Sequence, residues 1–256
     1  MSPEKFALAV AIAVFAAGII GLLLQRILPE ASTTGGPRDM IGAVVGLLTL
    51  LSALTMGLLI WTAYGVYAAQ NVAIQSLAVK AIQLDQALAD YGPDAKDLRL
   101  QLRDGIGKTI DAVWGANGSD ANFAADNFTA ALRNMHTRAA ALDALHPSTD
   151  AQTKAVAVAK ATNDAIAESR LQMTFALAAP VSYPLLLTVI AWAMLLFCGF
   201  GLMSRGHAMS MVAVFVGACA SASAIYMILA LSSPYSGVFR VSPAPLRQVL
   251  AVVGKE

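Results

Sequence analysis

The hydrophobic residues of this chain form long uninterrupted runs at both ends and spaced stripes in the middle. The longest stretch without an acidic or basic residue is Met40–Val79. Its first part, up to about Tyr64, is long enough to cross a bilayer, which takes about 20 helical residues. It contains no proline, and apolar residues recur at helical spacing beyond Tyr64. The pattern therefore predicts one helix from Met40 to about Asp90 that crosses lipid and continues beyond it.

Three other apolar runs have the length of a membrane span: 6–24, 183–202 and 208–231. The first is joined to the span that starts at Met40 by a segment rich in turn-forming proline and glycine, 25–39. The last two are joined by 204–207, which is short enough only for a tight hairpin. Four spans place both termini, and the region between spans two and three, on one side of the membrane.

The region 70–174 differs from the spans because it carries ten Lys/Arg and twelve Asp/Glu residues. Its apolar residues return every three or four positions, which is typical of amphipathic helices. The stripes are Ile74, Leu77, Ala81, Leu84 and Leu88; Leu98, Leu102, Ile106, Ile110 and Val113; Phe128, Leu132, Met135, Leu142 and Leu145; and Val156, Ala159, Asn163 and Ile166. Breaks are expected at Gly92-Pro93, with Asp94 capping the next helix, near Gly115, and at Pro147, with Ser148 or Thr149 opening the last helix. The region therefore predicts a bundle of four helical segments.

The predicted fold is an all-α membrane protein with four transmembrane helices. An all-helical soluble region lies between spans two and three, and the second span is continuous with it. The predicted divisions are 1–69 for spans one and two, 70–174 for the soluble bundle, 175–231 for spans three and four, and 232–256 for a cytoplasmic tail. The tail ends in a short helical stripe, Leu246 to Val253, which either lies on the membrane surface or packs on the bundle.

Residues near the span ends bear on orientation. Positive charges are slightly more numerous on the side of the termini and the bundle, so the positive-inside rule favours a cytoplasmic location for both. We therefore expect an integral protein of the plasma (inner) membrane. The aromatic residues expected at the interface on that side are Phe6, Trp61, Tyr64, Tyr183 and Tyr235.

Composition supports a bilayer partner and argues against several functions. Apolar residues make up 57% of the chain and charged residues 13%, whereas soluble domains carry about 25% charged residues. The net charge is +1 without a basic run, which argues against a nucleic-acid partner. The three histidines are isolated and both cysteines lie in apolar segments, so neither a metal site nor a cofactor is predicted. No catalytic set and no intramembrane acid or base is found, which argues against an enzyme and against an ion-coupled transporter.

One face of the second span carries small and hydroxyl residues at helical spacing, and these are the candidate pore-lining residues: Gly42, Val45, Thr49, Ser52, Met56, Leu59 and Ala63. Hydroxyl groups on such a face replace part of the hydration of an ion. The alternative is that small residues there serve close helix packing, with Gly42 and Gly46 forming a G-x-x-x-G motif. We call these seven residues the predicted lining.

Three arginines lie next to the connections on the side opposite the bundle: Arg26, Arg38 and Arg205. Several copies of the chain around an axis would gather these arginines into a ring that attracts anions. The alternative is that they are ordinary interfacial arginines beside lipid headgroups.

Several segments in order along nearly the whole chain carry a family resemblance. They are Arg38-Asp39, Leu84-Asp85 followed by Tyr91 to Ala95, Pro234 to Gly237, Arg240 to Ser242, and Pro245 to Arg247. Together they resemble the bestrophin-like family of bacterial and plant membrane proteins. The resemblance implies a distant relation to bestrophins, pentameric anion channels whose second span lines the pore. Two departures are that Met40–Val79 has no phenylalanine and that no acidic cluster corresponds to the bestrophin calcium clasp.

Two functions are therefore in competition. The first is an oligomeric channel for small anions, a homopentamer by the resemblance, with span two lining the axis. The second is a non-conducting membrane scaffold or sensor whose helical bundle binds a partner or a small ligand.

Overall fold

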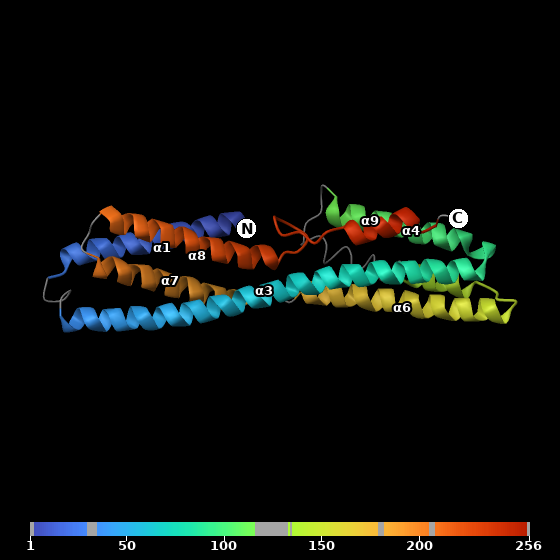
Figure 1. Cartoon of the computed structure of the whole chain (residues 1–256), viewed down its shortest axis with the longest axis horizontal. Coiled ribbons are helices and arrows are strands. Elements are labelled where there is room, and N and C mark those ends of the chain that lie inside the picture. Colours follow the sequence, from blue (N-terminus) through green and yellow to red (C-terminus); the bar gives the residue numbers. More distant parts are fainter. Residues whose placement is uncertain are drawn as a thin grey trace. The chain divides into compact units, whose positions relative to one another are not determined.

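The computed structural model of the chain describes residues 3–29, 35–115, 133, 135–178, 182–204 and 208–254. Every regular element in these ranges is helical (Figure 1). The elements are α1 (Pro3–Ile27), α3 (Gly36–Tyr91), the 3-10 turn η1 (Pro93–Ala95), α4 (Lys96–Trp114), α6 (Asp150–Ala178), α7 (Tyr183–Met203), α8 (Ala208–Leu231) and α9 (Ala244–Val252). The all-α prediction is confirmed. The helices long and apolar enough to cross a membrane are α1, α3, α7 and α8, which are the four predicted spans.

The second predicted span is one uninterrupted helix, as expected. Helix α3 has 56 residues, which at 1.5 Å per residue makes it about 84 Å long. Pro37 lies in its first turn, where the missing amide proton is tolerated. It ends at Tyr91 because Gly92 has a φ of +112° and Pro93 follows. The chain divides into two compact units, and α3 contributes to both of them.

Unit 1 comprises 1–65 and 180–232 and contains the membrane-spanning helices. Its centre is α1, which packs on α7 and α8. The approach of α1 and α7 is close because glycines meet there: a Cβ atom on Gly21 would collide with the carbonyl of Cys198. Without a hydrophobic force between helices in lipid, small residues at such crossings provide the van der Waals contact that holds them together.

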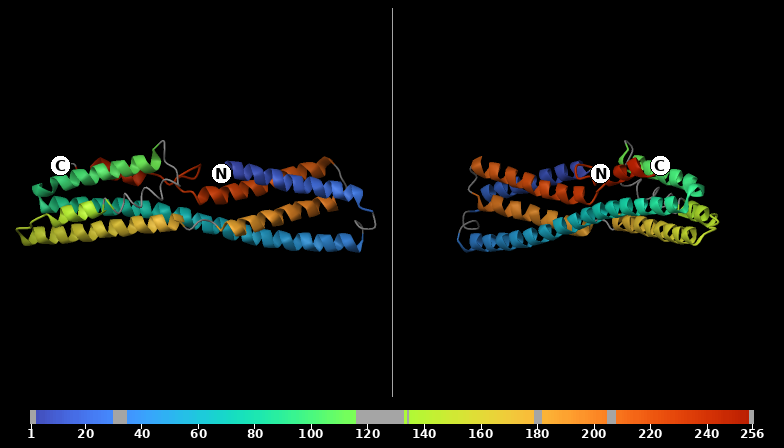
Figure 2. Two further views of the ribbon diagram at one scale, coloured as in Figure 1. Left: turned by 180° about the vertical axis from the view of Figure 1, so that it is seen from behind. Right: turned by 45° about the vertical axis from the view of Figure 1, so that its right-hand side comes forward.

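Unit 2 comprises the described residues within Val66–Ala179 and Ser233–Glu256, and its core is one hydrophobic cluster. Figure 2 shows α6 alongside the second part of α3 in both views. The predicted stripe of α4 is buried in this cluster from Leu98 to Val113. Helix α9 packs on α4 and buries Leu246, Val249 and Val253. The tail therefore packs on the bundle, which decides between the two locations left open by its sequence.

The start of α6 follows its predicted capping signal. Thr149 Oγ1 accepts a hydrogen bond from Gln152 N (3.2 Å), and Gln152 Oε1 accepts one from Ser148 N (2.9 Å). These bonds occupy amide donors that a helix start leaves without a partner inside the helix. Gln152 Nε2 also donates to Tyr91 O (3.1 Å), so the same side chain satisfies a carbonyl at the end of α3.

Two expectations about single residues were wrong. Asp94 does not cap α4: Pro93 starts a 3-10 turn, and the capping position falls on Ala95, which makes no side-chain cap bond. Tyr235 is not an interfacial aromatic residue, because its side chain is 1% exposed within the core of unit 2. Its hydroxyl donates to Gln70 Oε1 (2.7 Å), which pairs the polar end of the ring inside the core.

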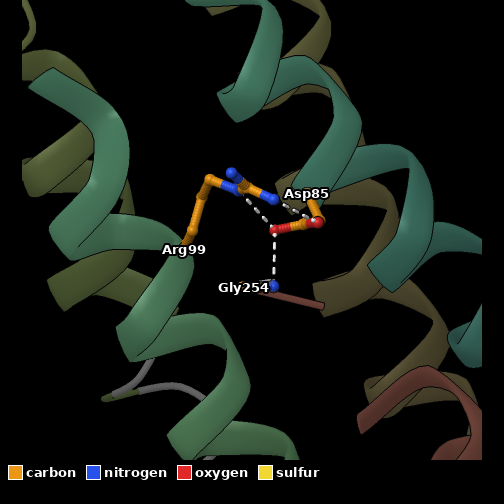
Figure 3. A network of polar contacts seen from close by, with 3 residues as sticks. All are labelled: Asp85, Arg99 and Gly254. Atoms are coloured by element: carbon orange, nitrogen blue, oxygen red, sulfur yellow. Dashed lines mark hydrogen bonds and ion pairs between the residues drawn. The ribbon is translucent and has the colours of Figure 1, made fainter. Parts of the chain in front are cut away.

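An ion pair ties three segments of unit 2 together (Figure 3). Arg99 of α4 donates from Nε to Asp85 Oδ1 (2.8 Å) and from Nη2 to Asp85 Oδ2 (3.1 Å). The backbone N–H of Gly254, just after α9, donates to the same Oδ1 (3.3 Å). A two-pronged guanidinium–carboxylate pair with little exposure is stronger than an ordinary surface pair.

We predict that Asp85→Asn destabilises the protein by about 2–3 kcal/mol, because it leaves the poorly hydrated Arg99 guanidinium without its counter-charge. The matched control is Asp104→Asn, which breaks the exposed pair between Asp104 and Lys108 (2.6 Å) and is expected to cost less than about 0.5 kcal/mol. Denaturant unfolding of the purified protein measures both. Equal effects of the two substitutions would contradict this assignment.

Candidate functional site

The predicted lining of α3 is turned largely towards the chain's own helices. Val45, Ser52, Leu59 and Ala63 are buried within a single chain. Gly42 and Met56 are half-buried, and Thr49 alone of the seven is exposed. The covering helix is α7: Val45 fills the space beside Gly199, and a Cβ on Gly42 would lie 3.3 Å from Met203 Cε.

This burial favours the packing interpretation of the small residues and leaves the pore-lining role a prediction. The two hydroxyl groups of the predicted lining, those of Thr49 and Ser52, differ in their hydrogen bonding. Thr49 Oγ1 donates to Val45 O (2.8 Å), so its proton is used inside the helix. Ser52 Oγ is buried and has no hydrogen-bond partner among the described residues.

The opposite side of α3, which we call the open face, is uncovered in unit 1. Its large side chains are 56–75% exposed: Leu47, Leu50, Leu54, Leu58 and Trp61. In the most apolar window of α3, 11% of the residues are buried, against 28–39% in the other three spans. Among the four spans, α3 therefore offers the most apolar surface to lipid or to another protein.

Small residues run along this open face. Gly46 and Gly57 are eleven residues apart, close to three helical turns, and Ala53 lies between them on the same side. A Cβ atom on either glycine would meet nothing within 4 Å. The hydrophobic pattern alone does not reveal this face. The membrane part of α3 is apolar on all sides, so no periodic pattern distinguishes one side from another. The spacing of Gly46 and Gly57 is the one sequence signal for it.

Arg38 and Arg26 lie at the ends of helices in unit 1. Arg38 Nη2 donates to Met203 O (3.4 Å) at the C-terminus of α7, and Arg26 is exposed in the last turn of α1. Both positions suit a cation, because the last carbonyls of a helix carry partial negative charge. Arg205 lies outside the described residues. The arginine ring proposed for the mouth therefore stays a prediction.

Unit 2 contains a cavity that no sequence motif predicted. It has a volume of about 60 Å³ available to the centres of water molecules and lies between α3, α4, α6 and α9. Arg138 and Arg170 both line it, together with Thr109, Trp114 and a majority of apolar side chains. They are far apart in sequence and lie outside every motif considered above, so only the fold brings them together.

The two arginines have no acidic partner among the described residues. Arg170 Nη2 donates to Thr109 Oγ1 (3.2 Å), whose own proton goes to Gly105 O (2.8 Å). Burial lowers the pKa of Arg138. Burial and then the charge of Arg138 lower the pKa of Arg170 to about 10. Arginine side chains are not deprotonated in proteins near neutral pH, so both groups are cations there, and each raises the electrostatic energy of the other.

The described residues contain no group of three or more His, Cys, Asp or Glu side chains placed to hold a metal ion. The family model of the Bestrophin-like domain matches residues 10–246 of the chain. The chain belongs to the bestrophin-like family. With its four apolar helices, it is an integral membrane protein. No curated protein and no solved structure matches it.

We predict that Arg38→Gln lowers stability by about 0.5–1 kcal/mol, because a hydrogen bond and a charge at the C-terminus of α7 are lost. Arg26→Gln is the control, since Arg26 is exposed in the last turn of α1 and has no cross-helix hydrogen bond among the described residues. Thermal unfolding of the detergent-purified variants measures the difference. A larger loss for Arg26→Gln than for Arg38→Gln would contradict the capping role.

Proposed function

We propose that this protein is an oligomeric membrane channel for small anions, with one α3 helix from each copy arranged around the axis. The observation that carries the proposal is membership of the bestrophin-like family over residues 10–246. The relation to bestrophins favours five copies, with the second span nearest the axis. Both termini and unit 2 would lie in the cytoplasm, below the plasma (inner) membrane, as the positive-inside rule favours.

The open face of α3 supports an assembly of this kind. The described residues of the same chain do not cover it, and its glycines allow the backbone of a neighbouring helix to approach. Thr49 is exposed and lies between the buried side of α3 and the line from Gly46 to Gly57. With the open face against neighbouring copies, Thr49 is the residue of the predicted lining best placed to reach an axis.

The chemistry of such a passage would be mostly apolar. Narrow apolar constrictions gate channels by excluding water, so the passage needs few polar groups to close. Anions would gather at a mouth bearing Arg26, Arg38 and Arg205 of each copy. The Thr49 hydroxyl now bonds to Val45 O (2.8 Å), and it would have to rotate away from this carbonyl to donate to a passing anion.

The alternative function, a non-conducting sensor or scaffold, is favoured by one specific observation, the cavity lined by Arg138 and Arg170. A ligand-binding bundle is compatible with signalling without conduction. Flux through the reconstituted protein separates the two functions, because the sensor passes no ions.

We predict that the purified protein in liposomes passes chloride, and that Thr49→Phe reduces this flux at least several-fold while the assembly stays intact. The reason is that the larger ring narrows an apolar passage at an exposed site. Thr62→Phe is the control, since Thr62 is exposed on another side of α3. Chloride-sensitive fluorescence measures the flux. An intact wild-type oligomer without flux would overturn the channel proposal.

We further predict that Gly46→Leu combined with Gly57→Leu separates the copies, because added side chains keep neighbouring helices apart. The folded single chain should survive, since neither position has a neighbour within 4 Å of the new Cβ. Native mass spectrometry and light scattering in detergent report the copy number. Thr62→Leu should leave the assembly unchanged. If the double variant assembles like the wild type, the open face is exposed to lipid and not to another copy.

A further inference from the structure

The cavity in unit 2 is a polar site inside an apolar core. Its walls are formed by side chains of α3, α4, α6 and α9, among them Leu77, Leu102, Ile166 and Leu246. The polar groups are the guanidiniums of Arg138 and Arg170 and the hydroxyls of Thr109 and Thr174. A core that needed only to pack would be filled by apolar side chains, which are less costly to bury than cations.

The side chains that line the cavity carry more hydrogen-bond donors than acceptors. Arg170 uses one N–H on Thr109 Oγ1 (3.2 Å), and a guanidinium has five. The Thr109 proton is taken by Gly105 O (2.8 Å), and the Thr174 hydroxyl donates to Arg170 O (3.0 Å). Arg138 lies beside the same turn, because its Nη2 would be in ordinary van der Waals contact (3.6 Å) with a Cβ atom at Gly105. Among the described residues, the two guanidiniums therefore have N–H groups without a partner beside one turn of α4.

Two like charges held side by side are stabilised by an anion between them. A carboxylate has the planar geometry that accepts paired bonds from guanidinium groups. The other walls are apolar, which favours a ligand with hydrocarbon attached to its charged group over a bare inorganic ion. Because each water centre needs about 10–15 Å³, the volume of about 60 Å³ fits a ligand of only a few heavy atoms.

We propose that this cavity is a binding site for a small organic carboxylate, whose charged group lies between Arg138 and Arg170 and whose short hydrocarbon part contacts the apolar wall. The wall includes Ile74, Leu77 and Ala81 of α3. A bound ligand therefore touches the helix that also crosses the membrane. The site does not depend on whether the protein conducts.

The test uses butyrate as the probe, with the full-length protein purified in detergent and followed by calorimetry and thermal unfolding. Butyrate is expected to bind and to raise Tm progressively with concentration. Butyramide, the neutral analogue of the same shape, should do neither. Equal effects of butyrate and butyramide would overturn the role of charge. An effect of inorganic phosphate larger than that of butyrate would overturn the assignment of an organic carboxylate.

The variant Arg170→Gln separates ligand binding from a structural role. Glutamine keeps a donor for Thr109 but removes a buried charge beside Arg138, so the ligand-free variant should be at least as stable as the wild type. The butyrate concentration needed to produce a given rise in Tm should be at least tenfold higher for this variant than for the wild type. Arg247→Gln, at an exposed position on α9, should keep the full response. A lower ligand-free stability of Arg170→Gln, together with an unchanged butyrate response, would overturn the proposal.

One further variant tests whether the chain supplies its own counter-charge. Asp120 and Asp126 are acidic residues outside the described part of the chain. If either neutralises the arginines, the wild type should ignore butyrate and the variant Asp120→Asn/Asp126→Asn should respond to it. That outcome overturns the site as a ligand site of the native protein. A butyrate response that is the same in both proteins supports it.

Discussion

The unbroken backbone of α3 is the constraint on which the rest of this structure depends. Inside a bilayer every backbone amide and carbonyl must be hydrogen-bonded within the protein, and a helix achieves this within a single segment. From Gly36 to Tyr91 that helix never stops, because no proline follows Pro37 until Pro93 and the glycines between them all accept helical geometry. Unit 1 and unit 2 therefore share one element.

Much of this architecture follows from sequence because its signals are local. Span lengths, the stop at Gly92-Pro93 and the start of α6 after Thr149 depend on residues within a few positions of one another. The stripe from Leu98 to Val113 has a clear 3.6-residue period, and all its predicted members are buried. Where local signals compete, the sequence predicts the outcome less well. Asp94 is a suitable capping residue for α4, but the 3-10 turn that starts at Pro93 places Ala95 at the capping position.

The remaining features depend on contacts between distant segments. Tyr235 follows the fourth span directly, so its position suggests an interface, yet its hydroxyl donates to Gln70 Oε1 (2.7 Å), 165 residues earlier in the chain. The sequence also does not show which side of α3 is covered, because apolar residues lie on all sides of this helix. The covered side is identified by its contacts with Gly199 and Met203 of α7. Arg138 and Arg170 likewise look like ordinary surface cations on amphipathic helices until the cavity is seen.

The arginine cavity and the open face place two different demands on the same helix. Along its membrane part α3 has small residues on an uncovered side, so its partners there are lipid or other helices. Along its second part, Ile74, Leu77 and Ala81 form a wall of the cavity. A ligand shifts a conformational equilibrium only by the difference in its affinity for the two states. For a carboxylate in this cavity, one source of that difference is the separation of Arg138 and Arg170, because the Coulomb energy of two cations around one anion depends on their distances. A movement of α6, which carries Arg170, relative to the segment that carries Arg138 would therefore change the affinity of the cavity for the ligand.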